Sequence, residues 1–254
     1  MLADSIPAVD AARAFQPFGA AHLVVIALTI TLPFVLAAFV RRSRWTRSER
    51  VIGRLLALLL LFNYVAFEVY LASTGGWLWQ KALPFHLCHW AMVVIIVALL
   101  TGRERWLEVA YFWGIGGTLQ AVLTPELKYA FPDIHFLNFF VAHSGIVVGI
   151  AFMMIVKKYR PHWSSIWRVF AWTELYFVVT IGIDLFTGEN YGYLLRPPAS
   201  GSLLDALSAN HVRYLLEMHL LALVFYVVLY LPFALYDLAT LGKTSHEGHK
   251  GTRR

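Results

Sequence analysis

The chain has 254 residues, of which 59% are hydrophobic and 14% are charged, and its mean hydropathy is +0.63. Because soluble domains carry about 25% charged residues, this composition excludes a soluble globular protein and indicates an integral membrane protein. The net charge of +6 would suit a nucleic-acid partner. Lys and Arg are, however, concentrated in every second loop, which is the pattern that orients a membrane protein, so we expect no nucleic-acid binding.

Seven apolar segments are each about long enough to cross roughly 30 Å of hydrocarbon as a helix rising 1.5 Å per residue. The predicted fold is therefore all-α, a polytopic membrane protein with about seven transmembrane helices. We expect a single transmembrane domain over residues 1–241, followed by a disordered, basic cytoplasmic tail over residues 242–254. The expected spans are 20–40, 52–72, 85–101, 107–124, 135–156, 167–186 and 213–236.

The basic residues also predict an orientation. Most of the 21 Lys and Arg residues fall between the first and second spans, the third and fourth, the fifth and sixth, and in the tail. Cytoplasmic loops are enriched in these residues, so the N-terminus is expected outside the cell and the C-terminus in the cytoplasm. The expected location is the cell (plasma) membrane. Residues 1–18 do not resemble a cleavable signal peptide, and we expect the first helix to be retained.

The third span opens with residues 84–89, Pro-Phe-His-Leu-Cys-His, which hold the only cysteine and two of the ten histidines. Reactive and ionisable groups are costly inside a membrane, so each is a candidate functional residue. On an ideal helix His86 and His89 share a face, whereas Cys88 lies about 200° from His86 and about 100° from His89. A base for Cys88 would therefore have to come from another helix.

Two further patterns concern packing. The glycines of the fourth span, together with Gly145 and Gly149 of the fifth, indicate helices that neighbours can approach closely. Residues 188–198, between the sixth and seventh spans, are rich in turn formers and predict an ordered cap. For His22 and His219, near the ends of their spans, a structural or interfacial role is favoured.

Polar side chains from every span lie in the outer half of their helices, except Glu174, which lies nearer the cytoplasm. A shared cavity open to the outside would explain this depth, because a lipid-facing charge there costs roughly 2.5 to 3.5 kcal/mol. The alternative is interhelical hydrogen bonds worth about 0.6 to 2 kcal/mol each. The residues expected to support the cavity are His86, His89, Asn63, Glu68, Gln120, Asp184, Asn190 and Glu217.

The chain resembles the YwaF-type family of multi-pass membrane proteins and its distant eukaryotic relatives. The resemblance rests on residues 83–88, 111–121, 123–125 and 143–146, and on Asn190-Tyr191 preceding Arg196-Pro197. One eukaryotic relative resembles a phospholipid acyltransferase with a membrane-embedded cysteine, and a broader group contains lipid hydrolases. The resemblance implies Cys88 as the nucleophile and His143 as its general base.

Three functions remain open. The first is an acyltransferase or lipid hydrolase without a cofactor, acting on membrane lipids and their phospholipid acyl chains, with Asn63 or Gln120 donating to the oxyanion. The second is a metal or haem site, for which His86 and His89 have suitable spacing. The third is a transporter or receptor with a polar outer vestibule. In the metal alternative the ligands would be His86, His89 and His143, with Glu68 or Glu217.

Overall fold

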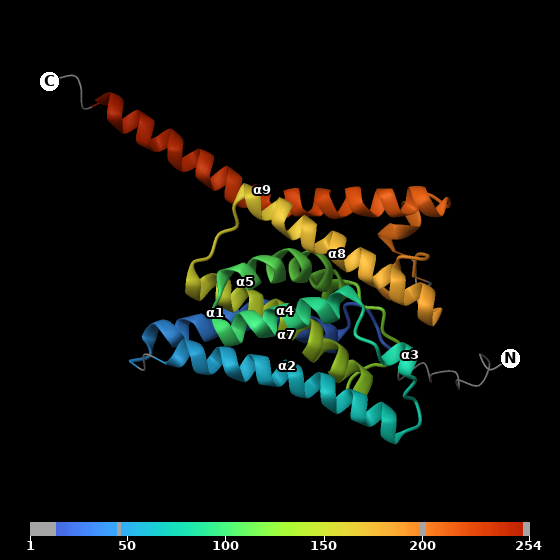
Figure 1. Ribbon diagram of the computed structural model, residues 1–254. Coiled ribbons are helices and arrows are strands. Elements are labelled where there is room, and N and C mark those ends of the chain that lie inside the picture. Colours follow the sequence, from blue (N-terminus) through green and yellow to red (C-terminus); the bar gives the residue numbers. More distant parts are fainter. Residues whose placement is uncertain (1–13, 45–46, 199–201, 251–254) are drawn as a thin grey trace. The chain divides into compact units, whose positions relative to one another are not determined.

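The computed structural model describes residues 14–44, 47–198 and 202–250, with side chains described as far as residue 239 (Figure 1). The described residues are predominantly helical. Among the described residues, β-structure is confined to one antiparallel bridge between Ala14 and Tyr129. The all-α prediction is therefore confirmed.

Within the described part of the chain, five helices are long and apolar enough to cross a membrane, which indicates a multi-pass membrane protein. The other two predicted spans, the third and the fourth, differ from this pattern. The third coincides with α4, whose 15 residues make it shorter than the others. The fourth coincides with three consecutive helical segments. The total of seven spans therefore stays a prediction, and so does the orientation of the termini. The five membrane-length helices are α1 (Ala20–Arg42), α2 (Ser48–Ser73), α7 (Ile134–Lys157), α8 (Trp163–Thr187) and the part His211–Ala239 of α9.

The chain divides into two compact units, residues 1–159 and 160–254. The prediction of a single domain over 1–241 and of a disordered tail over 242–254 stays a prediction. Helix α9 (His211–Lys250) continues into the range of that tail, and residues 251–254 lie outside the described residues.

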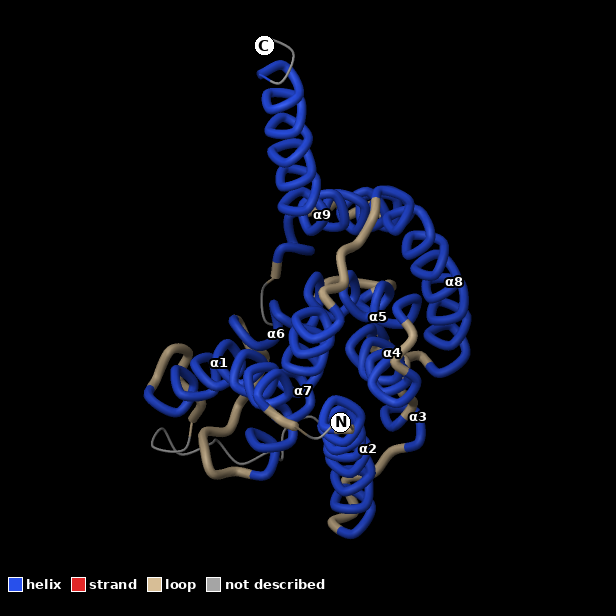
Figure 2. The backbone as a smooth tube through the Cα atoms, turned by 90° about the vertical axis from the view of Figure 1, so that its left-hand side faces the viewer, coloured by secondary structure: helices blue, strands red, loops and turns tan. Residues whose placement is uncertain are grey.

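Helix α7 is the centre of the first unit, because α1, α2, α4 and α6 all pack against it (Figure 2). Two glycines of α7 make this possible. A Cβ atom at Gly145 would come within 2.8 Å of Leu60 on α2, and one at Gly149 within 3.2 Å of Ile95 on α4. The predicted packing face of α7 is thus confirmed.

The fourth predicted span contains a stretch of π-helix. It consists of α5 (Glu104–Ala110), the π-helix η2 (Tyr111–Thr118) and α6 (Leu119–Leu123). Gly114 in η2 lies against Ile150 of α7, so close that a side chain there would meet the isoleucine. A π-helical turn is rare and often marks a functional site, because it widens the helix and redirects its side chains. The unit is completed by α3 (Trp79–Ala82), which precedes α4 (Leu87–Thr101).

The second unit consists of α8, α9 and the cap between them, which contains the short helices η3 (Tyr191–Tyr193) and η4 (Leu203–Ala206). The Asn190 side chain orders this cap. Its oxygen accepts hydrogen bonds from the backbone N–H groups of Leu195 and Arg196, and its nitrogen donates to the Arg196 carbonyl at 2.9 Å. The predicted ordered cap is confirmed.

Candidate functional site

Cys88 is the second residue of α4. The helix begins at Leu87, and His86 is its N-cap in an extended conformation without a side-chain capping bond. Pro84 disfavours helical geometry in Leu83, the extended C-cap of α3, and so helps to separate α3 from α4. The His89 N–H donates to the His86 carbonyl at 2.9 Å in the first turn of the helix, which also holds Cys88.

Three histidines lie together beside this helix start, and we call His86, His89 and His143 the histidine cluster. The ring centroids of His86 and His89 are 5.9 Å apart. His143, on α7, is near enough to interact electrostatically with both of them. The structure therefore brings together three of the predicted site residues from two helices.

His143 has a defined tautomer. Its Nδ1 lies 2.7 Å from the carbonyl oxygen of Phe139, and a carbonyl can only accept, so Nδ1 carries the hydrogen. Phe139 also stacks on the imidazole, with ring centroids 4.1 Å apart. Nε2 is consequently the nitrogen with a lone pair, which is the state that a general base requires.

No hydrogen bond joins Cys88 to His143 in the described residues. His143 Nδ1 is committed to the Phe139 carbonyl instead. Within the described part of the chain, no three His, Cys, Asp or Glu side chains are arranged to hold a metal ion. The metal alternative built on His86, His89 and His143 therefore gains no support from the geometry.

The other predicted residues of the first unit have different surroundings. The Asn63 amide nitrogen donates to the Asn138 side-chain oxygen at 2.9 Å and to its backbone oxygen at 3.2 Å, which ties α2 to α7. This engages the nitrogen that was expected to stabilise an oxyanion. Glu68 accepts a hydrogen bond from the indole N–H of Trp77 at 2.9 Å, and the Gln120 side chain is exposed.

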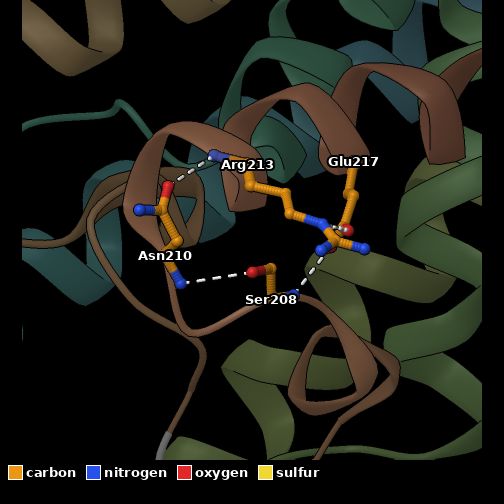
Figure 3. A network of polar contacts seen from close by, with 4 residues as sticks. All are labelled: Ser208, Asn210, Arg213 and Glu217. Atoms are coloured by element: carbon orange, nitrogen blue, oxygen red, sulfur yellow. Dashed lines mark hydrogen bonds and ion pairs between the residues drawn. The ribbon is translucent and has the colours of Figure 1, made fainter.

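The three predicted residues of the second unit organise the cap. Asn190 holds residues 195 and 196, as described above. Asp184 is fully buried and accepts a hydrogen bond from the Tyr191 N–H at 2.7 Å through one carboxylate oxygen. Glu217 accepts from the Ser208 N–H at 2.7 Å and from Arg213 Nε at 2.8 Å (Figure 3). Each of these residues thus holds the cap, and a cavity shared with the first unit stays a prediction.

His22 is a structural residue. Its Nδ1 accepts a hydrogen bond from the Phe18 N–H at 2.9 Å, and its Nε2 donates to the Val122 carbonyl at 2.8 Å. Only 1% of the residue is exposed. A neutral imidazole with both nitrogens paired in this way joins α1 to α6 and has no free atom for chemistry.

Two features of the site were missed from the sequence. The Leu87 and Cys88 N–H groups at the start of α4 are candidate oxyanion donors, because the first N–H groups of a helix have no intrahelical partner. In addition, His89 Nδ1 and Thr118 Oγ1 are buried without a hydrogen-bond partner in the described structure. Thr118 follows Gly117, where a Cβ atom would lie 3.5 Å from Leu87. The Pro-x-His spacing before the cysteine could have indicated the helix start.

Comparison with known proteins gives a family match across most of the chain. The sequence model of the TMEM164 family matches residues 17–230. An uncharacterized protein of Treponema pallidum (strain Nichols) is 26% identical over 230 residues, which cover 86% of this chain and 90% of that protein. No solved structure matches the chain. These matches support the predicted resemblance to a membrane-protein family, while neither carries the YwaF name or an acyltransferase relationship.

Proposed function

The chain belongs to the TMEM164 family, and from that premise we propose that it is a membrane-embedded lipid acyltransferase or lipid hydrolase with Cys88 as its nucleophile. The observation that carries the proposal is the placement of Cys88. Cys88 lies in the first turn of α4, and the histidine cluster lies at the start of the same helix, so an imidazole is available to activate the thiol. We place the protein in the plasma membrane, with this site facing outward.

In the proposed reaction His143 acts as the base through Nε2. It takes the thiol proton, and the sulfur attacks the ester carbonyl of a membrane lipid. The carbon–sulfur bond forms, the ester carbon–oxygen bond breaks, and the imidazolium returns the proton to the leaving alkoxide. An alcohol, or water in the hydrolase, then attacks the thioester, loses its proton to His143, and releases the acyl product and the thiol.

Charge on the tetrahedral oxygen would be stabilised by the N–H groups of Leu87 and Cys88. Oriented backbone donors at a helix start need no reorganisation during the reaction, and removing a comparable donor in other enzymes costs about a hundredfold to a thousandfold in rate. The step requires the Cys88 sulfur and His143 Nε2 to approach each other when lipid binds. Catalytic hydrogen bonds are often long in the unliganded state and tighten in the complex.

An alkyne-tagged lipid β-lactone tests the proposal, because ring opening transfers its acyl group to a reactive thiol. Membranes containing the wild-type protein should be labelled, whereas Cys88→Ala and His143→Ala should not. His135→Gln is a matched control on α7, since His135 is paired with Asp133 outside the histidine cluster. Lipid extracts of cells with and without the protein should differ in acyl composition. Equal labelling of wild type and Cys88→Ala would disprove the nucleophile.

A further inference from the structure

A second polar site lies within the second unit, where Glu174 of α8 faces His219 of α9. Glu174 Oε2 is 3.1 Å from His219 Nε2. Both residues belong to helices of membrane-spanning length, and Glu174 is near the middle of α8. Ionisable groups in such a position are expensive and indicate a functional site. Neither residue takes part in the reaction proposed for Cys88.

The other nitrogen of His219 orients the imidazole. Nδ1 donates to the Leu215 carbonyl, because a carbonyl oxygen can only accept. This contact directs Nε2 toward the Glu174 carboxylate, 3.1 Å from Oε2.

The second carboxylate oxygen of Glu174 is unsatisfied. Oε1 is buried and has no hydrogen-bond partner among the described residues. Leaving a buried acceptor unpaired is costly, and native structures rarely do so without a role for the atom. Oε1 consequently offers a strong acceptor to any group that can donate a hydrogen bond.

This pair forms one side of a pocket of about 140 Å³ in the second unit. The remaining walls are apolar and come from both helices and the cap. A volume of this order accommodates roughly a benzene-sized group. The pocket thus suits the junction between a polar donor and a hydrocarbon chain. Its apolar walls are Phe177, Val178, Ile181, Leu194 and Leu215.

We propose that this pocket binds a hydroxyl-bearing amphiphile from the bilayer, with the hydroxyl donating to Glu174 Oε1 and the hydrocarbon lying against the apolar walls. A hydroxyl donates the hydrogen bond that Oε1 lacks and brings no charge of its own among the apolar walls.

The test uses a photoreactive monoacylglycerol carrying a diazirine in its acyl chain, with the wild-type protein in phosphatidylcholine nanodiscs. Crosslinks should map to peptides of α8 and α9 that line the pocket. The same probe with both hydroxyls methylated should crosslink about tenfold less, the factor expected for one hydrogen bond to a charged acceptor. Because both probes are compared on one folded protein, this contrast does not depend on how any variant folds.

A second contrast uses variants. Glu174→Gln should lower crosslinking by the hydroxyl probe about tenfold, while the control Glu189→Gln and the nucleophile variant Cys88→Ala should keep the wild-type level. Equal crosslinking by the hydroxyl and methylated probes would overturn the proposal. Stronger crosslinking by the corresponding amine would overturn the choice of a hydroxyl, and crosslinks confined to other peptides would overturn the location.

Discussion

The site around Cys88 and the polar network at the start of α9 both gather polar side chains at the start of a helix, but their hydrogen bonding differs. In the network, Asn210 Oδ1 accepts from the Arg213 N–H, and Glu217 accepts from both Ser208 and Arg213 (Figure 3). Around Cys88, by contrast, His89 Nδ1 and Thr118 Oγ1 are buried without partners among the described residues.

This difference separates two uses of polar residues in one membrane protein. Fully paired groups hold a loop or join two helices, and their energies are those of ordinary interhelical contacts. Buried groups without partners cost free energy, so each needs an explanation such as a bound water, an ion or a role in the reaction. Depth in the membrane alone does not distinguish the two.

Replacing Cys88 should have the largest effect on activity. Without the sulfur no thioester forms, and we expect Cys88→Ala to lower acyl transfer or hydrolysis at least about a thousandfold. Its melting temperature in detergent should stay close to that of wild type, because the side chain is only partly buried. Turnover of a radiolabelled phospholipid measures the rate of acyl transfer or hydrolysis. Undiminished turnover by Cys88→Ala would show that Cys88 is not the nucleophile, and the contrast between its surroundings and the network on α9 would have no functional meaning.

Replacing His143 should have the next largest effect. Loss of a general base typically costs about a hundredfold to ten-thousandfold, so His143→Ala should retain less than about one hundredth of the wild-type rate. The same turnover assay applies, with His135→Gln as the control on the same helix. If both variants lose activity equally, the loss reflects damage to α7 and not the absence of a base.

Replacing Asn190 should affect stability more than chemistry. Asn190→Ala removes the acceptor of two backbone N–H groups and one donor to a carbonyl, and we expect about 1 to 3 kcal/mol of destabilisation. The melting temperature in detergent and the rate of proteolysis of the loop between α8 and α9 both measure this loss of stability. A rate loss without a change in melting or proteolysis would place Asn190 among the reactive residues instead.

Replacing Asn63 should have the smallest effect. Asn63→Ala breaks its hydrogen bonds to Asn138 between α2 and α7, and interhelical bonds of this kind are worth about 0.6 to 2 kcal/mol. Turnover at a temperature well below melting should match wild type. A hundredfold loss of turnover would mean that Asn63 stabilises the oxyanion. Hydrogen-bond pairing would then no longer separate structural residues from reactive ones.

Hydrophobic length and glycine spacing predicted the helices and the packing face of α7, because both depend on local sequence. The hydrogen-bond partners of Asn63 and Glu217 could not be predicted in this way, since Asn138 lies on another helix and Ser208 in a loop. Helix projection placed His86 on the helix, whereas α4 begins at Leu87 and His86 is its extended N-cap, so the projected angle between His86 and Cys88 does not apply. Projection also could not show that His143 lies near His86 and His89, because that depends on how α7 packs against α4.

The central claim is that the Cys88 sulfur carries an acyl group during the reaction, and mass spectrometry of the peptide containing Cys88 tests it most directly. Wild-type protein in nanodiscs would be given a phospholipid with a deuterated acyl chain and no acceptor alcohol, then quenched and digested. The account predicts that this peptide gains the mass of the deuterated acyl group and loses it on treatment with neutral hydroxylamine. An unmodified Cys88 in a sample that still turns over lipid would contradict the account.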